Sequence, residues 1–186
     1  MNNLRLLNYR CFTDTGDIDI RPITLLIGAN STGKSSLLKF FPLLKQTLGE
    51  FNNGLFLWNG SLVDFQDFNN TVRDGQGEMT IGFTITHLPV RSRTGNNYEI
   101  VDDVRAEITL SEQNGNKHDD YIKRMSILFD KHVFLYENTD NETIKLTVDS
   151  LSSTELKDEI VLGYTNALLP KISYVLMQNL ICFQLN

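Results

Sequence analysis

Apolar and polar residues alternate along the first part of the chain, and this period of two predicts β-strands. Residues 3–12 place leucines and then aromatic residues on alternate positions, which predicts a first strand followed by a turn through residues 14–17. Residues 17–20 alternate aspartate with isoleucine, which predicts a second, short strand. The sequence Ile-Thr-Leu-Leu-Ile at residues 23–27 is almost wholly apolar, so it predicts a buried strand of a parallel sheet.

Helical spacing of the apolar residues replaces this alternation after the third strand. Residues 34–48 predict a helix, and Gly49 is suited to its C-cap. Pro42 lies inside this helix and predicts a kink or a break, because proline lacks an N–H and its ring crowds the preceding turn. Residues 50–77 contain many Asn and Gly residues, which predicts a surface connection. Three aromatic residues are expected to anchor it: Trp58, Phe65 and Phe68.

Alternation returns between residues 79 and 149, where turns rich in Asn and Gly separate the alternating segments. This pattern predicts an antiparallel meander of about four or five strands. The sequence Ser-Ser-Thr-Glu from Ser152 fits a capping box and predicts a helix to about Gly163, before an apolar segment at residues 174–181. We therefore predict a first subdomain (1–48), a connection (49–78), an antiparallel lobe (79–150) and the start of a helical region (151–186).

Composition narrows the range of functions. The net charge of −6 gives no overall basic field, so composition does not support nucleic-acid binding, although a local basic groove stays open. Two cysteines are too few for a disulfide framework, and Cys11 beside Phe12 is predicted to be a small core residue. We find no signal peptide and no long apolar run, which predicts a cytoplasmic protein without a membrane span. The histidines lack the spacing of metal ligands: His87, His118 and His132.

Residues 28–35, Gly-Ala-Asn-Ser-Thr-Gly-Lys-Ser, match the phosphate-binding pattern G-x-x-x-x-G-K-[ST] without a mismatch. A predicted strand precedes the motif and a predicted helix follows it, which is the context that this P-loop requires. Gly28 and Gly33 permit backbone angles with which the loop can wrap around an anion. Lys34 is expected to reach the β- and γ-phosphates, and the Ser35 hydroxyl to bind Mg²⁺. The motif predicts nucleotide binding but specifies neither the nucleotide nor its cleavage.

The first 48 residues resemble the N-terminal lobe of ATPases related to the structural-maintenance-of-chromosomes and recombination-repair proteins. The resemblance rests on the leucine-rich first strand, the sequence Asn-Tyr-Arg-Cys-Phe at residues 8–12, the short acidic strand, and Asn30 within the loop. It implies the α/β fold of ABC-type P-loop ATPases, in which an antiparallel lobe follows the P-loop helix. It also implies ATP and Mg²⁺ as cofactors, and a homodimer or higher oligomer of the full-length protein.

A narrower resemblance links residues 41–46, 58–60 and 63–68 to the ATPase subunit of the Septu and retron anti-phage defence systems. This resemblance implies an HNH-type nuclease subunit as a candidate partner. Carried over by position, the broader resemblance places Arg10 close to the nucleotide. The residues that it places around the phosphates are Gly28, Asn30, Ser31, Thr32, Gly33, Lys34, Ser35 and Ser36.

The chain also departs from these relatives. They carry a signature sequence near Leu-Ser-Gly-Gly, an apolar strand that ends in Asp-Glu, and a switch histidine, and none of the three is present here. The resemblance therefore implies an N-terminal portion, or a truncated product, of a longer ATPase whose catalytic half is missing from this chain. It also implies a glutamine that contacts the metal, for which the candidates are Gln46, Gln66, Gln76 and Gln178.

Two other functions stay open. A GTP-binding protein is an alternative because residues 74–77 fit D-x-x-G and residues 116–119 fit N-K-x-D. Neither match follows an apolar strand that would hold it rigidly. The other alternative is an interaction module that binds nucleotide without hydrolysing it, which the absence of a catalytic carboxylate supports.

Overall fold

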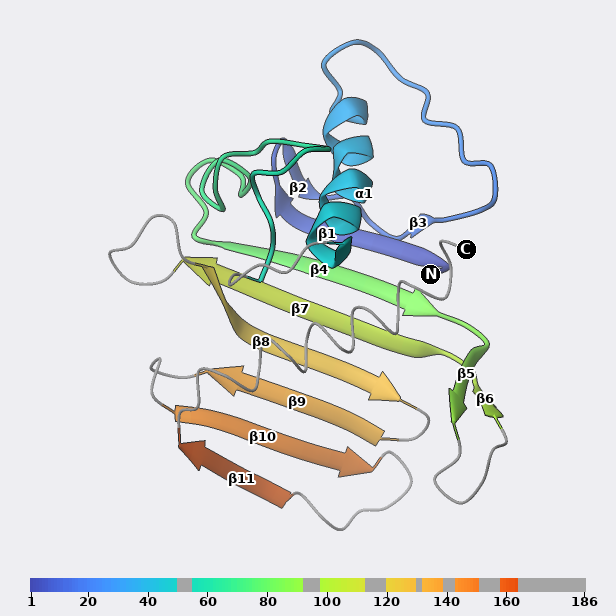
Figure 1. Ribbon diagram of the computed structural model, residues 1–186, viewed down its shortest axis with the longest axis vertical. Coiled ribbons are helices and arrows are strands. Elements are labelled where there is room, and N and C mark those ends of the chain that lie inside the picture. Colours follow the sequence, from blue (N-terminus) through green and yellow to red (C-terminus); the bar gives the residue numbers. More distant parts are fainter. Residues whose placement is uncertain are drawn as a thin grey trace.

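The described residues form a long antiparallel sheet with one helix across it (Figure 1). The computed structural model describes residues 1–49, 55–91, 98–112, 120–129, 132–138, 143–150 and 158–163. The sheet has the order β11-β10-β9-β8-β7-β4-β1-β2, with β3 also paired to β1, and β5 and β6 form a separate hairpin. The bounds of the elements are β1 Asn3–Tyr9, β2 Phe12–Asp14, β3 Ile18–Asp19, α1 Lys34–Gly49, β4 Glu78–Ile85, β5 Leu88–Arg91, β6 Tyr98–Val101, β7 Val104–Glu112, β8 Asp120–Phe129, β9 His132–Asn138, β10 Thr143–Ser150 and β11 Asp158–Gly163.

The alternation of apolar residues decides which face of the sheet is buried. In β4, buried and half-buried positions alternate along the whole strand. Strand register then aligns apolar residues of neighbouring strands: Leu6 lies opposite Ile81, Ile81 opposite Ile108, and Ile108 opposite Met125. Because side chains of a strand alternate between the two faces, these residues form one continuous apolar row. The predicted antiparallel meander is confirmed, with β4, β7, β8, β9 and β10 in the sheet and the β5–β6 hairpin inserted between β4 and β7.

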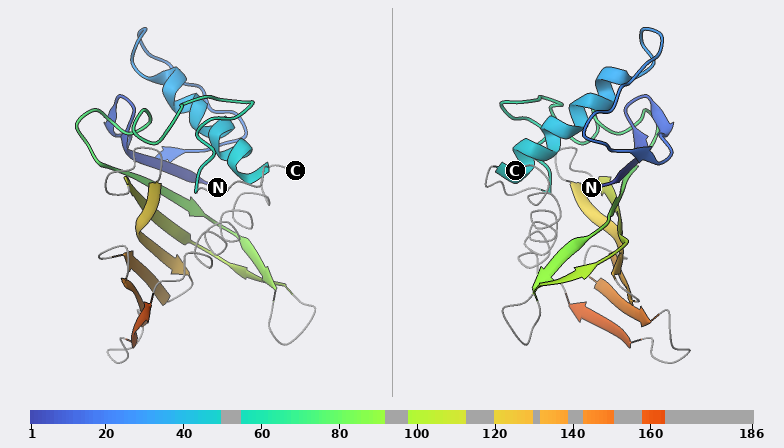
Figure 2. Two further views of the ribbon diagram at one scale, coloured as in Figure 1. Left: turned by 60° about the vertical axis from the view of Figure 1, so that its left-hand side comes forward. Right: turned by 90° about the vertical axis from the view of Figure 1, so that its right-hand side faces the viewer.

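The helix α1 covers the apolar face at the β1 and β4 end of the sheet (Figure 2). Its residues Phe40 and Leu43 are fully buried, which explains the orientation of the helix. The helix is continuous through Pro42, so the predicted break is wrong. Pro42 removes one hydrogen bond from the helix, and the buried residues on either side of it hold the chain in helical form. In the described part of the chain, no helix has the length and apolarity that a membrane span needs.

Residues 55–77, within the predicted connection between helix and meander, contain none of the named helices or strands. The predicted role of the aromatic residues of this connection is confirmed, because Trp58, Phe65 and Phe68 are all buried. Trp58 stacks on Phe56 with ring centroids 5.0 Å apart, and Phe68 meets Trp58 edge-on at 5.8 Å. The connection therefore packs its own side chains into the core beside α1.

The prediction of a buried strand at residues 23–27 is wrong. These residues form no strand, and Ile23, Leu25 and Ile27 are exposed by 83%, 79% and 92%. In Figure 1 the chain arches away from the sheet after β3 before it enters α1. A strand needs hydrogen-bonding neighbours on its edges, and no described strand pairs with this segment.

Two other predicted boundaries are corrected. The first strand ends at Tyr9, because a turn at Arg10 and Cys11 reverses the chain into β2. The helix predicted from Ser152 to about Gly163 is wrong for residues 158–163, which form β11 and pair with β10. The apolar, β-branched residues of that segment favour a strand beside β10. Residues 152–157 lie outside the described residues, as does the apolar segment at 174–181.

Candidate functional site

The loop of residues 28–33 leads directly into the first turn of α1 (Figure 1). The first helical hydrogen bond runs from the Leu37 amide to the Gly33 carbonyl at 2.9 Å. Amides in the first turn of a helix have no partner within the helix and carry the positive end of its dipole. Ser31 and Gly33 adopt left-handed backbone angles, with φ of 64° and 91°. The loop therefore turns sharply at the position where a helix favours an anion.

Gly33 is required by both its backbone angle and its surroundings. A Cβ at this position would lie 2.5 Å from Cys11 Sγ and 2.5 Å from Cζ of Phe12. The turn between β1 and β2 therefore packs directly against the loop. A second contact fixes the same turn, because the Tyr9 hydroxyl donates to the Ser36 carbonyl at 2.8 Å. The hairpin thus supports both the loop and the first turn of α1.

The ammonium group of Lys34 lies inside the curve of the loop. Its Nζ donates to the Gly28 carbonyl at 2.8 Å and also to the carbonyl of Ala29. Thr32 belongs to the same group of hydrogen bonds, because its Oγ1 donates to the Ala29 carbonyl at 2.9 Å and lies 3.4 Å from Lys34 Nζ. The lysine charge is therefore held within the loop that leads into α1. A phosphate group is the ligand that suits this combination of cation and amides.

A cavity of about 560 Å³ adjoins the loop. Its wall combines apolar side chains with the polar side chains of Asp14, Thr15, Thr32 and Lys34. Its lining residues are Phe12, Asp14, Thr15, Ile18, Leu25, Leu26, Ile27, Gly28, Thr32, Lys34 and Leu37. Arg5 neutralises the carboxylate of Asp14 through two hydrogen bonds of 3.0 and 2.6 Å. These bonds, with a further one from the Gly16 amide, lower the pKa of Asp14 to about 2. Because Asp14 is paired with a cation, its charge opposes an anion at the loop less than a free carboxylate would.

The other predicted site residues are only partly gathered here. Ser35 is exposed in the first turn of α1, and Asn30 is exposed in the loop, so both are open to a ligand. Arg10 lies in the turn that touches Gly33, but its guanidinium is directed elsewhere. That group lies over the Phe65 ring, 5.3 Å from its centroid, and donates to the Asn70 carbonyl. The structure thus groups residues 28–36 and leaves Arg10 at their border.

Gln46 is excluded as the glutamine that contacts a metal. It is 3% exposed, and its side-chain amide donates to the carbonyls of Leu57 and Val63. Its Oε1 accepts from the amides of Val63 and Leu62 at 2.9 and 3.2 Å. Both polar atoms of the Gln46 side chain therefore bond to the connection and hold it against α1. Gln66 and Gln76 are exposed and stay candidates, whereas Gln178 lies outside the described residues.

Sequence reasoning missed the role of the β1–β2 turn. Cys11 was expected in the core, but it is exposed, and its sulfur lies against Gly33. No residue in Tyr-Arg-Cys-Phe signals a turn, so the sequence alone gave no cue for this contact. Among the described residues, no group of three or more His, Cys, Asp or Glu could hold a metal. A Mg²⁺ ion that is bound through a serine and nucleotide phosphates needs no such cluster.

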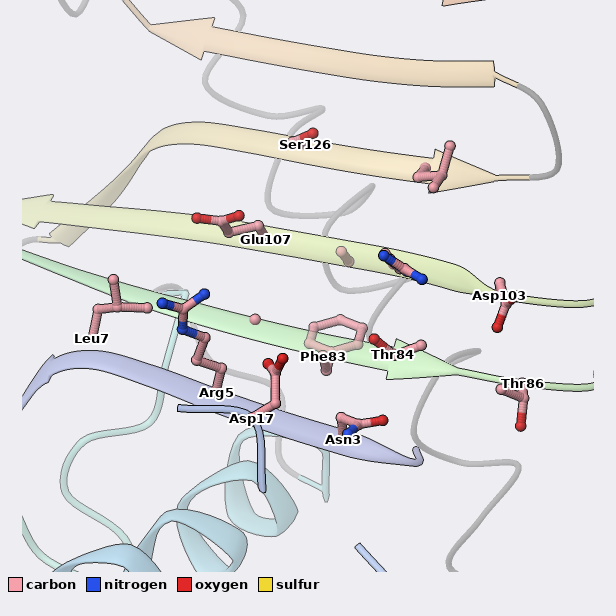
Figure 3. A pocket seen from close by; sticks show the side chains of 14 residues that line it. Asn3, Arg5, Leu7, Asp17, Phe83, Thr84, Thr86, Asp103, Glu107 and Ser126 are labelled. Atoms are coloured by element: carbon pink, nitrogen blue, oxygen red, sulfur yellow. The ribbon is translucent and has the colours of Figure 1, made fainter. Parts of the chain in front are cut away.

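A second cavity of about 530 Å³ lies on the other face of the sheet (Figure 3). Its lining carries charges of both signs, namely the cations Arg5 and Arg105 and the carboxylates of Asp17, Asp103 and Glu107. Arg5 is already paired with Asp14. Because the charges are mixed, this face offers no concentrated positive potential for a phosphate group. The loop at residues 28–33 is therefore the better candidate site.

Of the two GTPase motifs, the described residues include only the first. Residues 74–77 follow none of the described strands; an isolated bridge between Val72 and Tyr9 precedes them, and the Gly77 carbonyl accepts from the Glu112 amide at 3.4 Å. Gly75 has a φ of 77°, and a Cβ there would meet nothing within 4 Å, so this segment is an open turn. Residues 116–119 lie outside the described residues. The structure of the first motif therefore gives no support to a guanine-nucleotide site.

Comparison with known proteins identifies the family. The family model of an AAA ATPase domain matches residues 1–176, which is most of the chain. No match was found among curated proteins or among solved structures. The loop, the lysine that lies within it and the following helix are the features that such a domain uses to hold phosphate. The chain therefore belongs to the family of AAA ATPase domains.

Proposed function

We propose that this chain binds ATP with Mg²⁺ through residues 28–36 and forms the phosphate-binding part of an ABC-type ATPase. The observation that carries the proposal is the closed loop around Lys34 at the start of α1. A bound phosphate would replace the loop carbonyls as the partner of the Lys34 ammonium. The loop amides and the helix dipole would hold the phosphate oxygens. Ser35 would supply its hydroxyl to Mg²⁺. The family itself implies a nucleotide and usually Mg²⁺.

Hydrolysis in this proposal requires groups from a further part of the ATPase. Phosphoryl transfer depends on positioned charges, including a residue that orients the attacking water, and the sequence offers no Asp-Glu strand for this role. The exposed apolar segment at residues 23–27 supports the proposal, because it has the composition of an internal strand without its neighbours. Exposed apolar patches of this kind mark contact surfaces. We infer that strands of the missing catalytic half cover this segment.

The narrower assignment is to the ATPase subunit of an anti-phage defence or DNA-repair-like complex. What supports it is the resemblance at residues 41–46, 58–60 and 63–68. These three sequences form one packing unit, since Gln46 bonds to Val63, and a Cβ at Gly60 would lie 2.6 Å from Gln46. In this assignment the full-length protein forms a homodimer or higher oligomer and has an HNH-type nuclease subunit as partner.

A titration with Mg-ATP and Mg-GTP tests the proposed function. We expect saturable ATP binding and weaker binding of GTP, with little or no turnover by this chain alone. Gly33→Ala should weaken ATP binding at least about ten-fold, because the new methyl group must displace Cys11 or Phe12 and the left-handed angle disfavours alanine.

Gly75→Ala is the matched control, because Gly75 shares a positive φ but has open space around it. This variant should lose some stability and keep its ATP affinity. Equal affinity for GTP would favour the GTP-binding alternative. Rapid hydrolysis by the chain alone would contradict the inference that the catalytic groups lie in a further half, and binding without turnover even in a longer protein would favour the non-hydrolysing module.

A further inference from the structure

Tyr9 is a fully buried tyrosine whose hydroxyl group has no part in the phosphate site described above. The hydroxyl donates to the Ser36 carbonyl at 2.8 Å, and this bond joins the end of β1 to the first turn of α1. Burial raises the pKa of Tyr9, so the hydroxyl stays protonated and remains a donor at neutral pH. A phenylalanine would fill the same apolar space, so packing alone does not account for the hydroxyl.

The position of the Tyr9 ring is fixed from several directions. Phe40 and Phe65 meet the ring edge-on, with centroids 5.6 and 6.3 Å away. The backbone of Tyr9 lies opposite Phe12 in the β1–β2 pairing, and it also forms the isolated bridge with Val72. The hydroxyl is therefore presented to α1 from a constrained side chain.

The carbonyl that accepts from Tyr9 is the start of a chain of hydrogen bonds. Within one peptide group, the Ser36 carbonyl is joined to the amide of Leu37, and that amide donates to the Gly33 carbonyl at 2.9 Å. The Gly33 carbonyl is joined in the same way to the amide of Lys34. Two consecutive hydrogen bonds thus link the Tyr9 hydroxyl, through two planar peptide groups, to the Lys34 amide.

The Lys34 amide is the end of this chain at which an anion would bind. Lys34 is the first residue of α1, so its amide has no partner within the helix and lies at the positive end of the helix dipole. A peptide carbonyl that accepts a hydrogen bond is polarised, and its own amide becomes a stronger donor. The Tyr9 hydroxyl therefore strengthens the Lys34 amide as a donor and also restrains its orientation.

We propose that Tyr9 is a positioning residue for nucleotide binding, and that its hydroxyl acts on the Lys34 amide through this chain of hydrogen bonds. This proposal rests on the proposed function, because it assumes a nucleotide phosphate at residues 28–36. Tyr9 itself does not touch the nucleotide. It orients the peptide group between Gly33 and Lys34 before the ligand arrives, which leaves less ordering to the binding step.

Tyr9→Phe tests the proposal, because it removes the hydroxyl and keeps the ring. Mg-ATP binding, measured by isothermal titration, should weaken roughly two- to five-fold, as expected if the bond from the Lys34 amide to phosphate loses its cooperative part. In ¹⁵N-labelled protein, the Lys34 amide proton should move upfield, because its hydrogen bond becomes weaker. Tyr136→Phe is the matched control, since Tyr136 is buried in β9, and β4, β7 and β8 separate that strand from β1. Its affinity should change by less than about 1.5-fold.

Site-specific replacement of Tyr9 by 3-fluorotyrosine tests the same chain in the opposite direction. Fluorine makes the phenol more acidic, so the hydroxyl becomes a stronger hydrogen-bond donor. The Lys34 amide proton should then move downfield, and Mg-ATP should bind more tightly than to the wild type. A hydroxyl that served only to stabilise the fold would not produce this gain.

The outcomes separate this proposal from the proposed function. A folded Tyr9→Phe protein with an unchanged Lys34 amide signal would overturn the proposal whether or not its affinity fell, while ATP binding that depends on the Lys34 side chain would leave the proposed function intact. If the wild type shows no binding that depends on Lys34, both are overturned. If Tyr9→Phe does not fold at the assay temperature, the fluorotyrosine protein decides, because unchanged affinity and an unchanged Lys34 signal would overturn the role of Tyr9.

Discussion

We expect Gln46→Leu to lower the free energy of unfolding by about 3–5 kcal/mol. The side-chain amide of Gln46 bonds to both backbone groups of Val63, to the Leu57 carbonyl and to the Leu62 amide. Leucine has a similar size but cannot pair with any of them. A buried polar group that loses its partner costs about 1–3 kcal/mol, and the bonds to Val63 are both buried. The connection after α1 should therefore detach from the helix before the sheet unfolds.

Urea unfolding of the variant measures this effect. Gln76→Leu is the matched control, because Gln76 is exposed and the same chemical change should alter stability by less than about 0.5 kcal/mol. Gly60→Ala offers a second approach to the same contact, since its Cβ would lie 2.6 Å from Gln46. A loss below about 1 kcal/mol for Gln46→Leu would mean that the aromatic residues alone hold the connection.

Lys34→Ala should weaken ATP binding about ten- to a hundred-fold. The lysine supplies the main positive charge at the loop, and a charge-assisted hydrogen bond to a phosphate is worth roughly 1.5–3 kcal/mol. The loop also loses the bonds from Nζ to the carbonyls of Gly28 and Ala29. Because Lys34 is only half-buried and bonds within its own loop, the global fold should change little.

Isothermal titration with Mg-ATP measures the affinity, and thermal melting shows that the variant is folded. Lys39→Ala provides the control, since Lys39 is an exposed lysine one turn further along α1. Its removal lowers the net charge by the same amount without touching the loop. Equal affinities for the wild type and a folded Lys34→Ala variant would contradict the assignment of the loop.

The sequence was sufficient for features that rest on local pattern. The P-loop motif requires a loop that enters a helix, and the structure places residues 28–36 in that arrangement. The strict alternation in β4 predicts one buried face, and Met79 and Ile81 are buried as expected. The aromatic residues of the connection were also predicted to anchor it. In each case the residues that make the contact lie close together in the sequence, or their apolar side chains follow the repeat of the strand or helix that they form.

Features that depend on distant partners were not predicted. Residues 23–27 have the composition of an internal strand, but pairing requires neighbours that the pattern itself cannot supply. The segment at 158–163 follows a capping sequence, yet its pairing with β10 outweighs that local signal. The turn at Arg10 and Cys11 contains no glycine or asparagine, and its left-handed angle at Arg10 is enforced by contacts with residues 64–73. Those contacts cannot be seen in the local sequence.

Amide chemical shifts of ¹⁵N-labelled protein during a titration with Mg-ATP test the central claim most directly, because they show which backbone groups meet the phosphates. Our account predicts that the largest changes occur at Gly33, Lys34 and Ser35, with smaller changes in the β1–β2 turn that packs against Gly33. Saturable ATP binding would contradict this account if these amide signals stayed unchanged and the signals of residues that line the second cavity, such as Arg105 and Glu107, shifted instead.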